Sequence, residues 1–164
     1  MQKWYNMKKK GKIMICILII LLCPIIDQFT KVLAINHLKD ISTMPIINNV
    51  FHLTYMENTG AAFSMLNQNT KFLTIITIIF ILILLFFLYK EVKGNNNIFM
   101  KIGVSFIIGG ALGNLIDRVM RSYVVDFFDL RIIHFAIFNV ADLFVTIGAI
   151  FVLYVLIFDK SYKI

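Results

Sequence analysis

The chain has 164 residues, of which 60% are hydrophobic and 15% are charged, and its mean hydropathy is +0.85. A soluble domain of this length is less apolar, and a disordered chain is richer in charge and proline, so both classes are excluded. The net charge of +7 would suit nucleic acid, but the basic residues gather beside the ends of apolar segments. The composition therefore indicates a multi-pass membrane protein without a nucleic-acid partner.

Four apolar segments are long enough to span a bilayer, which takes about 20 residues of helix. They cover residues 13–35, 72–89, 98–116 and 138–158. Ten basic residues lie on the side of the two termini and the connector between the second and third segments, against five on the other side. The positive-inside rule then predicts cytoplasmic termini, with segments 36–71 and 117–137 outside. We expect residues 1–164 to form one domain.

The first apolar segment contains two charged residues, Asp27 and Lys31, which are four apart and share a helix face. Two interpretations stay open: a neutralised structural pair, or a pair that orients a nearby site. Cys16 and Cys23 are two turns apart, too far for a disulfide, and are expected in the core. No small-x-small cleavage site follows the segment, so we expect it to remain as a transmembrane helix.

The next segment combines a predicted strand with an unusual turn. VFHLTYM (50–56) alternates and is rich in aromatic and β-branched residues, which is typical of a strand. ENTGAAFS (57–64) follows, and its Asn-Thr-Gly sequence is typical of a turn. Gly60 indicates a positive φ or a close approach of the backbone to a neighbour. We expect this turn to lie over a functional site; an ordinary hairpin turn is the alternative.

The third apolar segment ends in GGALGNLIDRVMR, where small and polar residues recur at helical intervals. Gly109 and Gly113 form a small-xxx-small ridge, which favours close helix packing. Gly110, Asn114 and Asp117 share a face that changes from small to polar. Asp117 has two arginines beside it and could serve only in salt bridges, so a structural and a catalytic role both stay open.

The fourth apolar segment opens with FNVAD, in which Asn139 and Asp142 are three residues apart and share a face. Polar residues at a helix start are often caps. We expect Asp142 one turn inside the helix, later than a cap would stand, which favours a functional role. Asp126 in the preceding VVDF ranks equally with Asp117 as its partner when spacing alone is considered. The three histidines show no ligand spacing, so no metal site is expected.

Five ordered motifs that span almost the whole chain resemble those of the lipoprotein signal peptidases, the type II signal peptidases of bacteria: DQFTK (27–31), NTGAAFS (58–64), GGALGNLIDR (109–118), VVDF (124–127) and FNVAD (138–142). The resemblance implies four transmembrane helices plus an extracytoplasmic β-rich platform in the bacterial cytoplasmic membrane. It also implies the task, which is removal of the signal peptide from diacylglyceryl-modified prolipoproteins just before the lipidated cysteine.

The resemblance selects Asp126 and Asp142 as the catalytic aspartates of an endopeptidase without metal or other cofactor. It implies supporting roles for eight further residues: Asp27, Lys31, Asn58, Gly60, Asn114, Asp117, Arg118 and Asn139. It further implies an active site near the outer leaflet and inhibition by the cyclic peptide globomycin. The expected partners are diacylated prolipoproteins and membrane lipids, and the chain is expected to be a monomer.

Two neighbouring carboxylates suit peptide hydrolysis because they tend to share one proton. The ionised one accepts a proton from water, and the protonated one hydrogen-bonds the scissile carbonyl; which residue is which stays open. A small transporter would also place Asp, Lys and Asn in the membrane, but the inverted repeats and broken helices typical of transporters are not visible. An assembly protein, whose polar groups serve only helix packing, is the other alternative.

Overall fold

The structure is a computed structural model that describes residues 2–60, 69–94, 97–133 and 135–162, with side chains from residue 11 onward. Its elements follow the chain in the order α1 (Gln2–Leu38), β1 (Thr43–Ile47), β2 (Phe51–Asn58), α2 (Thr70–Gly94), α3 (Ile98–Arg121), β3 (Val124–Leu130), the 3-10 helix η2 (Arg131–Ile133), α4 (Val140–Phe158) and the 3-10 helix η3 (Lys160–Tyr162).

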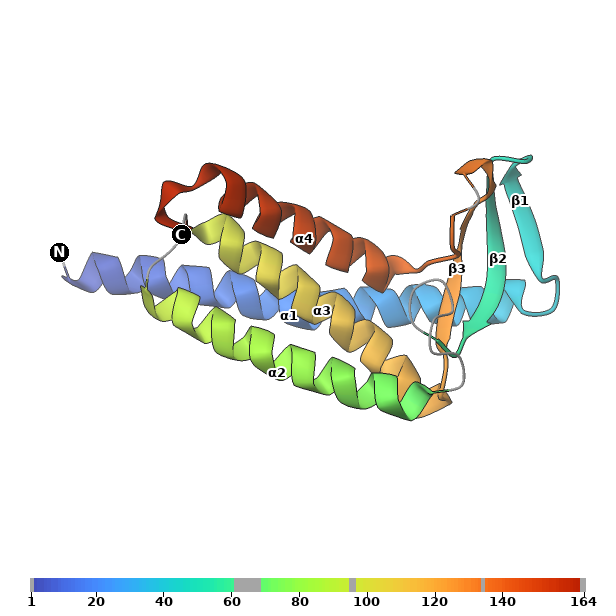
Figure 1. The fold of residues 1–164 in the computed structure, drawn as a ribbon, viewed down its shortest axis with the longest axis horizontal. Helices are drawn as coiled ribbons and strands as arrows, with labels where there is room; N and C mark the ends of the chain where they lie inside the picture. The colour runs from blue at the N-terminus through green and yellow to red at the C-terminus, as the bar shows by residue number, and fades with distance from the viewer. Residues whose placement is uncertain (1, 61–68, 95–96, 134, 163–164) are drawn as a thin grey trace.

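Four long helices run side by side, and a small sheet lies across one end of them (Figure 1). Within the described residues, four stretches are long and apolar enough to cross a membrane: Gly11–Leu38, Thr70–Gly94, Ile98–Arg121 and Val140–Phe158. Both ends of the chain lie at the end of the bundle away from the sheet. The expected fold class, a helical membrane protein with a small β element, is confirmed.

Helix α3 is the centre of the bundle, because it packs against α1, α2 and α4 and has the largest buried share of the four spans. Apolar side chains on the outer helices point away from the bundle, as a lipid solvent requires. The predicted glycine ridge is confirmed on α3. A Cβ at Gly109 would lie 2.7 Å from the Cβ of Cys23, and one at Gly113 would lie 2.6 Å from the Asp27 carboxylate. These glycines let α1 and α3 approach closely.

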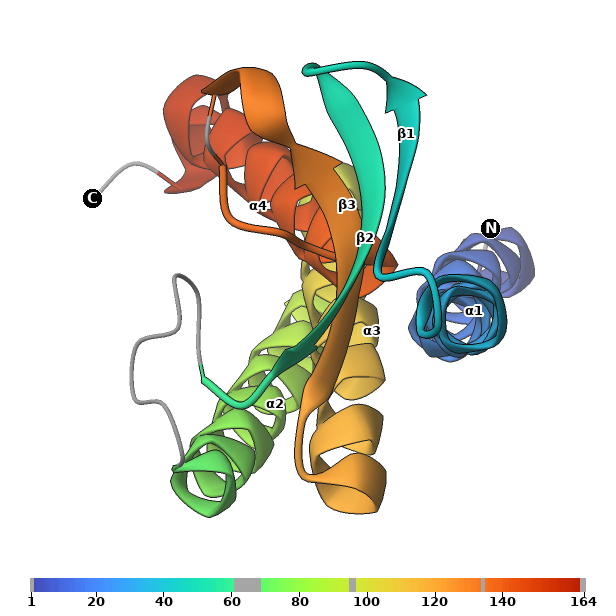
Figure 2. The ribbon, with the colours of Figure 1, turned by 90° about the vertical axis from the view of Figure 1, so that its right-hand side faces the viewer.

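The sheet is antiparallel in the order β1-β2-β3, and it passes across the ends of α3 and α4 (Figure 2). The strand predicted at 50–56 is confirmed as β2. Its irregular pairing with β3 brings Met56 opposite Asp126. Val125 and Phe127 of β3 pack on Ala34 and Leu38, which lie at the C-terminal end of α1. This apolar contact fastens the sheet to the bundle.

Helix α3 continues to Arg121, five residues beyond the segment expected from hydropathy. Asp117 and Arg118 therefore lie on the helix, whereas the sequence placed them in the outer connector. The helix ends at Ser122, whose φ of 65° is left-handed and whose N–H donates to the Arg118 carbonyl oxygen. Such a cap turns the chain sharply. Strand β3 therefore begins directly beside the end of α3, and Asp126 follows within four residues.

Candidate active site

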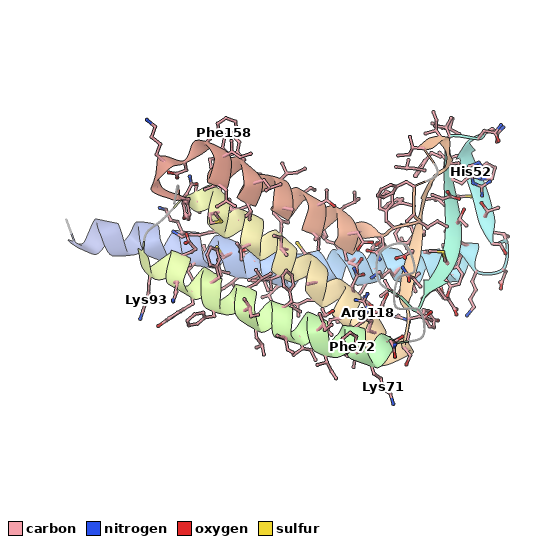
Figure 3. The ribbon with its side chains drawn as sticks, in the orientation of Figure 1. His52, Lys71, Phe72, Lys93, Arg118 and Phe158 are labelled. Atoms are coloured by element: carbon pink, nitrogen blue, oxygen red, sulfur yellow. The ribbon has the colours of Figure 1, made fainter. Side chains whose placement is uncertain are left out.

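A cavity of about 480 Å³ lies between the sheet and the ends of α3 and α4 that are next to it. Asp126 and Asp142 both line it, although they come from a strand and a helix. Asp126 is 2% exposed, and Asp142 is half-buried. Arg118 also lines the cavity, at the sheet end of the bundle (Figure 3). The remaining walls are mostly apolar and come chiefly from Ile133, Phe135, Ala136, Ile137, Phe138, Leu143 and Val145.

The Asp126 carboxylate is held by two amide side chains. Its Oδ1 accepts a hydrogen bond from Nδ2 of Asn139 at 2.6 Å, and its Oδ2 accepts one from Nδ2 of Asn58 at 2.9 Å. Asn58 ends strand β2, and Asn139 stands directly before α4. The sheet and the bundle therefore each supply one donor to the same carboxylate, which fixes its orientation between them.

The Asp142 carboxylate belongs to a helix cap, which corrects the sequence-based expectation. Helix α4 begins at Val140 with Asn139 as N-cap, so Asp142 is the third helical residue rather than one turn inside. Asn139 Oδ1 accepts from the Asp142 N–H, and Asp142 Oδ2 accepts from the Asn139 N–H, both at 3.1 Å. This reciprocal pair is a capping box. The other oxygen, Oδ1, accepts from Nδ2 of Asn114 at 2.8 Å.

Asn139 connects the two aspartates. Its Nδ2 donates to Asp126 and also to Oδ1 of Asn114 at 3.1 Å, and Asn114 in turn donates to Asp142. All four carboxylate oxygens accept a hydrogen bond from an amide held by the fold. Each oxygen has a second lone pair that can accept from water or substrate. The geometry therefore suits chemistry in which both carboxyl groups act on one reacting centre.

Burial is the main cause that raises the pKa of Asp126 to about 7, well above its ordinary 3.8. The hydrogen bond from Asn58 opposes this rise in pKa, and the nearby charge of Asp142 adds to it. A carboxyl group in an apolar cavity beside a second carboxylate resists ionisation for both reasons. Around neutral pH the Asp126 carboxyl group can therefore both hold and release a proton.

Asp27, Lys31 and Asp117 are brought together, but they do not line the cavity. Lys31 Nζ lies 2.8 Å from Asp27 Oδ2 and 3.1 Å from Asp117 Oδ2, and all three side chains are fully buried. The expected pairing of Asp27 with Lys31 is confirmed. Asp117 also pairs with Arg121. Of the two aspartates that the sequence ranked equally, only Asp126 lies at the cavity with Asp142.

Gly60 lies beside the site, and the contacts of its backbone, rather than a positive φ, account for a glycine at this position. No glycine in the described part of the chain has a positive φ, so that half of the expectation is wrong. Gly60 is buried, its N–H donates to Asn58 Oδ1 at 2.9 Å, and its carbonyl oxygen accepts from Arg118 Nη2 at 3.4 Å. Close approach of the backbone is the alternative that fits. The rest of the turn, residues 61–64, and His134 lie outside the described residues.

The guanidinium group of Arg118 can donate a further hydrogen bond. Its Nε is buried and has no hydrogen-bond partner among the described residues. A buried donor without a partner costs free energy unless a ligand or water satisfies it. Sequence reasoning missed Gln28, whose Nε2 donates to Asp117 Oδ1 at 3.0 Å and to the Gly113 carbonyl oxygen at 3.1 Å. A polar residue beside Asp27 in an apolar segment is the signal that could have found it.

The sequence model of the Signal peptidase (SPase) II family matches residues 19–158. The chain belongs to this family. It is 51% identical over 149 residues to a lipoprotein signal peptidase of Clostridioides difficile (strain 630), covering 90% of this chain and 99% of the relative. A lipoprotein signal peptidase of Caldanaerobacter subterraneus subsp. tengcongensis is 44% identical over 147 residues, with 90% of this chain and 99% of the relative covered.

Solved structures agree with this result. A bacterial membrane enzyme solved by the in meso method at 2.3 Å resolution superimposes with a TM-score of 0.78 at 38% identity, covering 91% of each chain. A second, solved at 1.9 Å, gives 0.76 at 38% identity, covering 88% of this chain and 94% of that one. The chain is therefore a multi-pass membrane peptidase of the aspartic type, and the transporter and assembly interpretations are set aside.

Proposed function

We propose that Asp126 and Asp142 are the catalytic pair with which this peptidase removes signal peptides from diacylated prolipoproteins. Cleavage would fall just before the lipidated cysteine, as the family resemblance implies. The observation that carries the assignment is that both carboxylates line one cavity and are joined through Asn139 and Asn114. Asp117, the other candidate, is occupied by Lys31 and Arg121.

In this mechanism one carboxyl group is protonated and the other is ionised when substrate binds. The ionised carboxylate accepts a proton from a water molecule as the water oxygen attacks the scissile carbonyl carbon. The protonated carboxyl group donates a hydrogen bond to the carbonyl oxygen, which stabilises the developing negative charge. As the tetrahedral intermediate collapses, the carbon–nitrogen bond breaks and a proton passes from the pair to the leaving amine. The pKa of Asp126 near neutrality supports such sharing of one proton.

Arg118 would bind the backbone of the substrate. Its Nε has no hydrogen-bond partner among the described residues, and Arg118 lines a cavity together with the two carboxylates, the amides of Asn58 and Asn114, and Thr146. A guanidinium group donates readily to a peptide carbonyl, and it would also moderate the charge that the pair develops. The apolar walls from η2 and α4 suit the apolar parts of the substrate, which enter from the bilayer.

The orientation in the membrane follows from charge. Both termini lie at one end of the bundle and the cavity at the other. The ten-to-five distribution of basic residues favours cytoplasmic termini, and it supports our proposal that the site lies near the outer leaflet of the bacterial cytoplasmic membrane. The enzyme would work there as a monomer among membrane lipids. Reporter domains inserted after Asn49 and after Gly94 should read as extracytoplasmic and cytoplasmic respectively; the reverse pattern would overturn this orientation.

The decisive experiment compares three aspartate variants in cleavage of a purified diacylated prolipoprotein. Asp126→Asn and Asp142→Asn should abolish cleavage while the helical content stays unchanged. Asp129→Asn is the matched control, because Asp129 lies on the same strand but bonds Thr54 and Arg131 instead of facing the cavity. It should cleave like the wild type. Substantial cleavage by either of the first two variants would refute the catalytic pair. Globomycin should compete with the substrate in the same assay.

A further inference from the structure

Four charged side chains between α1 and α3 form a neutral cluster beside the cavity. Asp27, Lys31 and Asp117 are fully buried, and Arg121, with 21% of its side chain exposed, closes the set. Lys31 lies between the two carboxylates, and Arg121 Nη1 contacts Oδ1 of Asp117, the oxygen that does not pair with Lys31. Two positive charges thus balance two negative ones. Balance matters here, because an unpaired charge inside a membrane protein is costly. We call these four residues the buried charge cluster.

The cluster holds the main chain next to each catalytic aspartate. Asp27 Oδ1 accepts a hydrogen bond from the backbone N–H of Ala141 at 2.9 Å, and Asp117 Oδ2 accepts one from that of Val125 at 3.0 Å. Ala141 directly precedes Asp142, and Val125 directly precedes Asp126. Hydrogen bonds to an ionised carboxylate are stronger than neutral ones. Two salt-bridged carboxyl groups of the cluster therefore fix the backbone from which Asp142 and Asp126 project.

Lys31 makes a third connection, through the side chain of Asn114. Its Nζ lies 2.9 Å from Asn114 Oδ1. The oxygen and nitrogen of an asparagine amide can exchange places by a flip of the side chain. A cation on one side favours the orientation in which the oxygen faces it. The amide nitrogen of Asn114 is thereby directed to Asp142. Lys31 and Nδ2 of Asn139 together thus favour the orientation in which the nitrogen of this amide meets Asp142.

Arg121 and Gln28 complete the cluster on the side of Asp117. Arg121 Nη1 also donates to Gln28 Oε1 at 3.3 Å, while Gln28 Nε2 donates to Asp117. Gln28 belongs to α1, whereas Asp117 and Arg121 belong to α3. Without Arg121, the salt bridges of Asp27 and Asp117 would both depend on Lys31. Arg121 therefore supplies the second positive charge in contact with Asp117.

We propose that the buried charge cluster is the positioning device of the active site, and that Arg121 acts in it by supplying the second positive charge. The four residues do not touch the substrate. They act through the amide groups of Ala141, Val125 and Asn114, so their loss should reduce turnover rather than substrate binding. The proposal rests on the assignment of Asp126 and Asp142 as the catalytic pair.

Arg121 offers the sharpest test, because it is partly exposed and its variants should fold. Arg121→Gln removes the charge and keeps a hydrogen-bond donor, and Arg121→Lys keeps the charge. For cleavage of a diacylated prolipoprotein in detergent, Arg121→Gln should lower kcat by about tenfold or more, because small displacements of reacting groups are costly. KM should change by no more than about threefold, since ground-state binding is untouched. Arg121→Lys should restore most of kcat.

A double variant and a control complete the experiment. Asp27→Asn combined with Arg121→Gln is again neutral, so its loss of kcat should be smaller than the product of the two single losses. Glu91→Gln changes a buried carboxylate at the opposite end of the bundle and should lower Tm without changing kcat. Equal losses in Arg121→Lys and Arg121→Gln, a change in Tm alone, or simple multiplication in the double variant would each overturn the proposal. Cleavage by Asp126→Asn would instead overturn the catalytic pair, so the two failures are distinguishable.

Discussion

The two ends of the helix bundle both bury polar side chains, but they use them differently. At the end far from the sheet, where Lys93 and Phe158 lie (Figure 3), Tyr162 donates to Glu91 and Asn97 donates to Asp159 at 2.8 Å. These bonds tie one secondary-structure element to the next. At the sheet end the polar bonds converge on the backbone beside two carboxylates and on one cavity.

The comparison teaches that buried polarity alone does not indicate a site. Glu91 is 5% exposed, about as buried as Asp126 at 2%, and each accepts a hydrogen bond from a side chain of another element. The two ends differ in the hydrogen-bonding capacity that their buried side chains leave unused. At the sheet end Arg118 retains a buried donor without a partner among the described residues, and it faces a cavity. Unused bonding capacity around a cavity is what marks this end for chemistry.

The largest difference between the ends should appear in the two aspartates of α4. Asp142→Asn, at its start, should lower kcat by about three orders of magnitude, because proton transfer contributes roughly 10²–10⁴. Asp159→Asn, at the C-cap that follows its end, should leave kcat unchanged, because the Asp159 side chain bonds Asn97 and Ser161 and is not among the residues that line the cavity. Single-turnover cleavage with saturating enzyme measures both. Equal losses at the two positions would remove the functional distinction between the ends.

The two N-cap asparagines provide the next comparison. Asn139 caps α4 beside the site, and Asn97 caps α3 at the far end. Replacement of either by Ala should cost about 1 kcal/mol of stability. Asn139→Ala should in addition lower kcat by roughly a hundredfold, since it also releases Asp126 and Asn114. Thermal unfolding and cleavage rates measured on the same preparations would show whether Asn139 is more than a cap.

Two glycines allow a smaller but clean comparison. Gly60 is buried beside Asn58 and Arg118, whereas a Cβ at Gly11 would meet nothing within 4 Å. Gly60→Val should lower kcat/KM by about tenfold, because a side chain would displace the backbone that Arg118 contacts. Gly11→Ala should cleave normally and gain helix stability of about 1 kcal/mol. If Gly60→Val cleaved as fast as the wild type, Gly60 would be an ordinary surface turn.

A last expected effect, on stability alone, concerns its dependence on pH. The pKa of Asp126 is raised in the folded protein to about 7 from 3.8, so the folded state binds this proton more tightly than the unfolded state. The stability that Asp126 contributes is complete below about pH 4 and is lost as pH rises through 7, by a few kcal/mol at most. This contribution of Asp126 to the change of stability with pH should be absent from Asp126→Asn and should be kept in Asp129→Asn. Unfolding of all three proteins from pH 4 to 8 tests this.

Local patterns were enough to predict the helices and one strand. Long apolar runs and the alternation at 50–56 depend only on neighbours in the sequence. The motifs also supplied the residues Asp126 and Asp142. What spacing could not separate was Asp117 from Asp126, because the choice depends on Lys31 and Arg121, which are brought in by packing of α1 on α3.

Other parts of the site depend on where elements start and end. Hydropathy does not sense a cap, so the start of α4 at Val140 and the role of Asp142 in it were missed. The continuation of α3 to Arg121 was missed because charged residues lower the hydropathy of its last turn. Gln28 acquires its role from contacts with residues more than 80 positions away, which a single sequence does not reveal.

Because Asp142 takes part in a capping box, its protonation should change the stability of the first turn of α4. Asp142 Oδ2 accepts a hydrogen bond from the Asn139 N–H, and Asp142 is one of the two carboxyl groups that we propose exchange protons during cleavage. When that group gains a proton its oxygens become poorer acceptors, so the first turn of α4 loosens with each protonation. The rate at which the Asn139 amide hydrogen exchanges for deuterium would then report the charge state of Asp142 without a covalently attached probe.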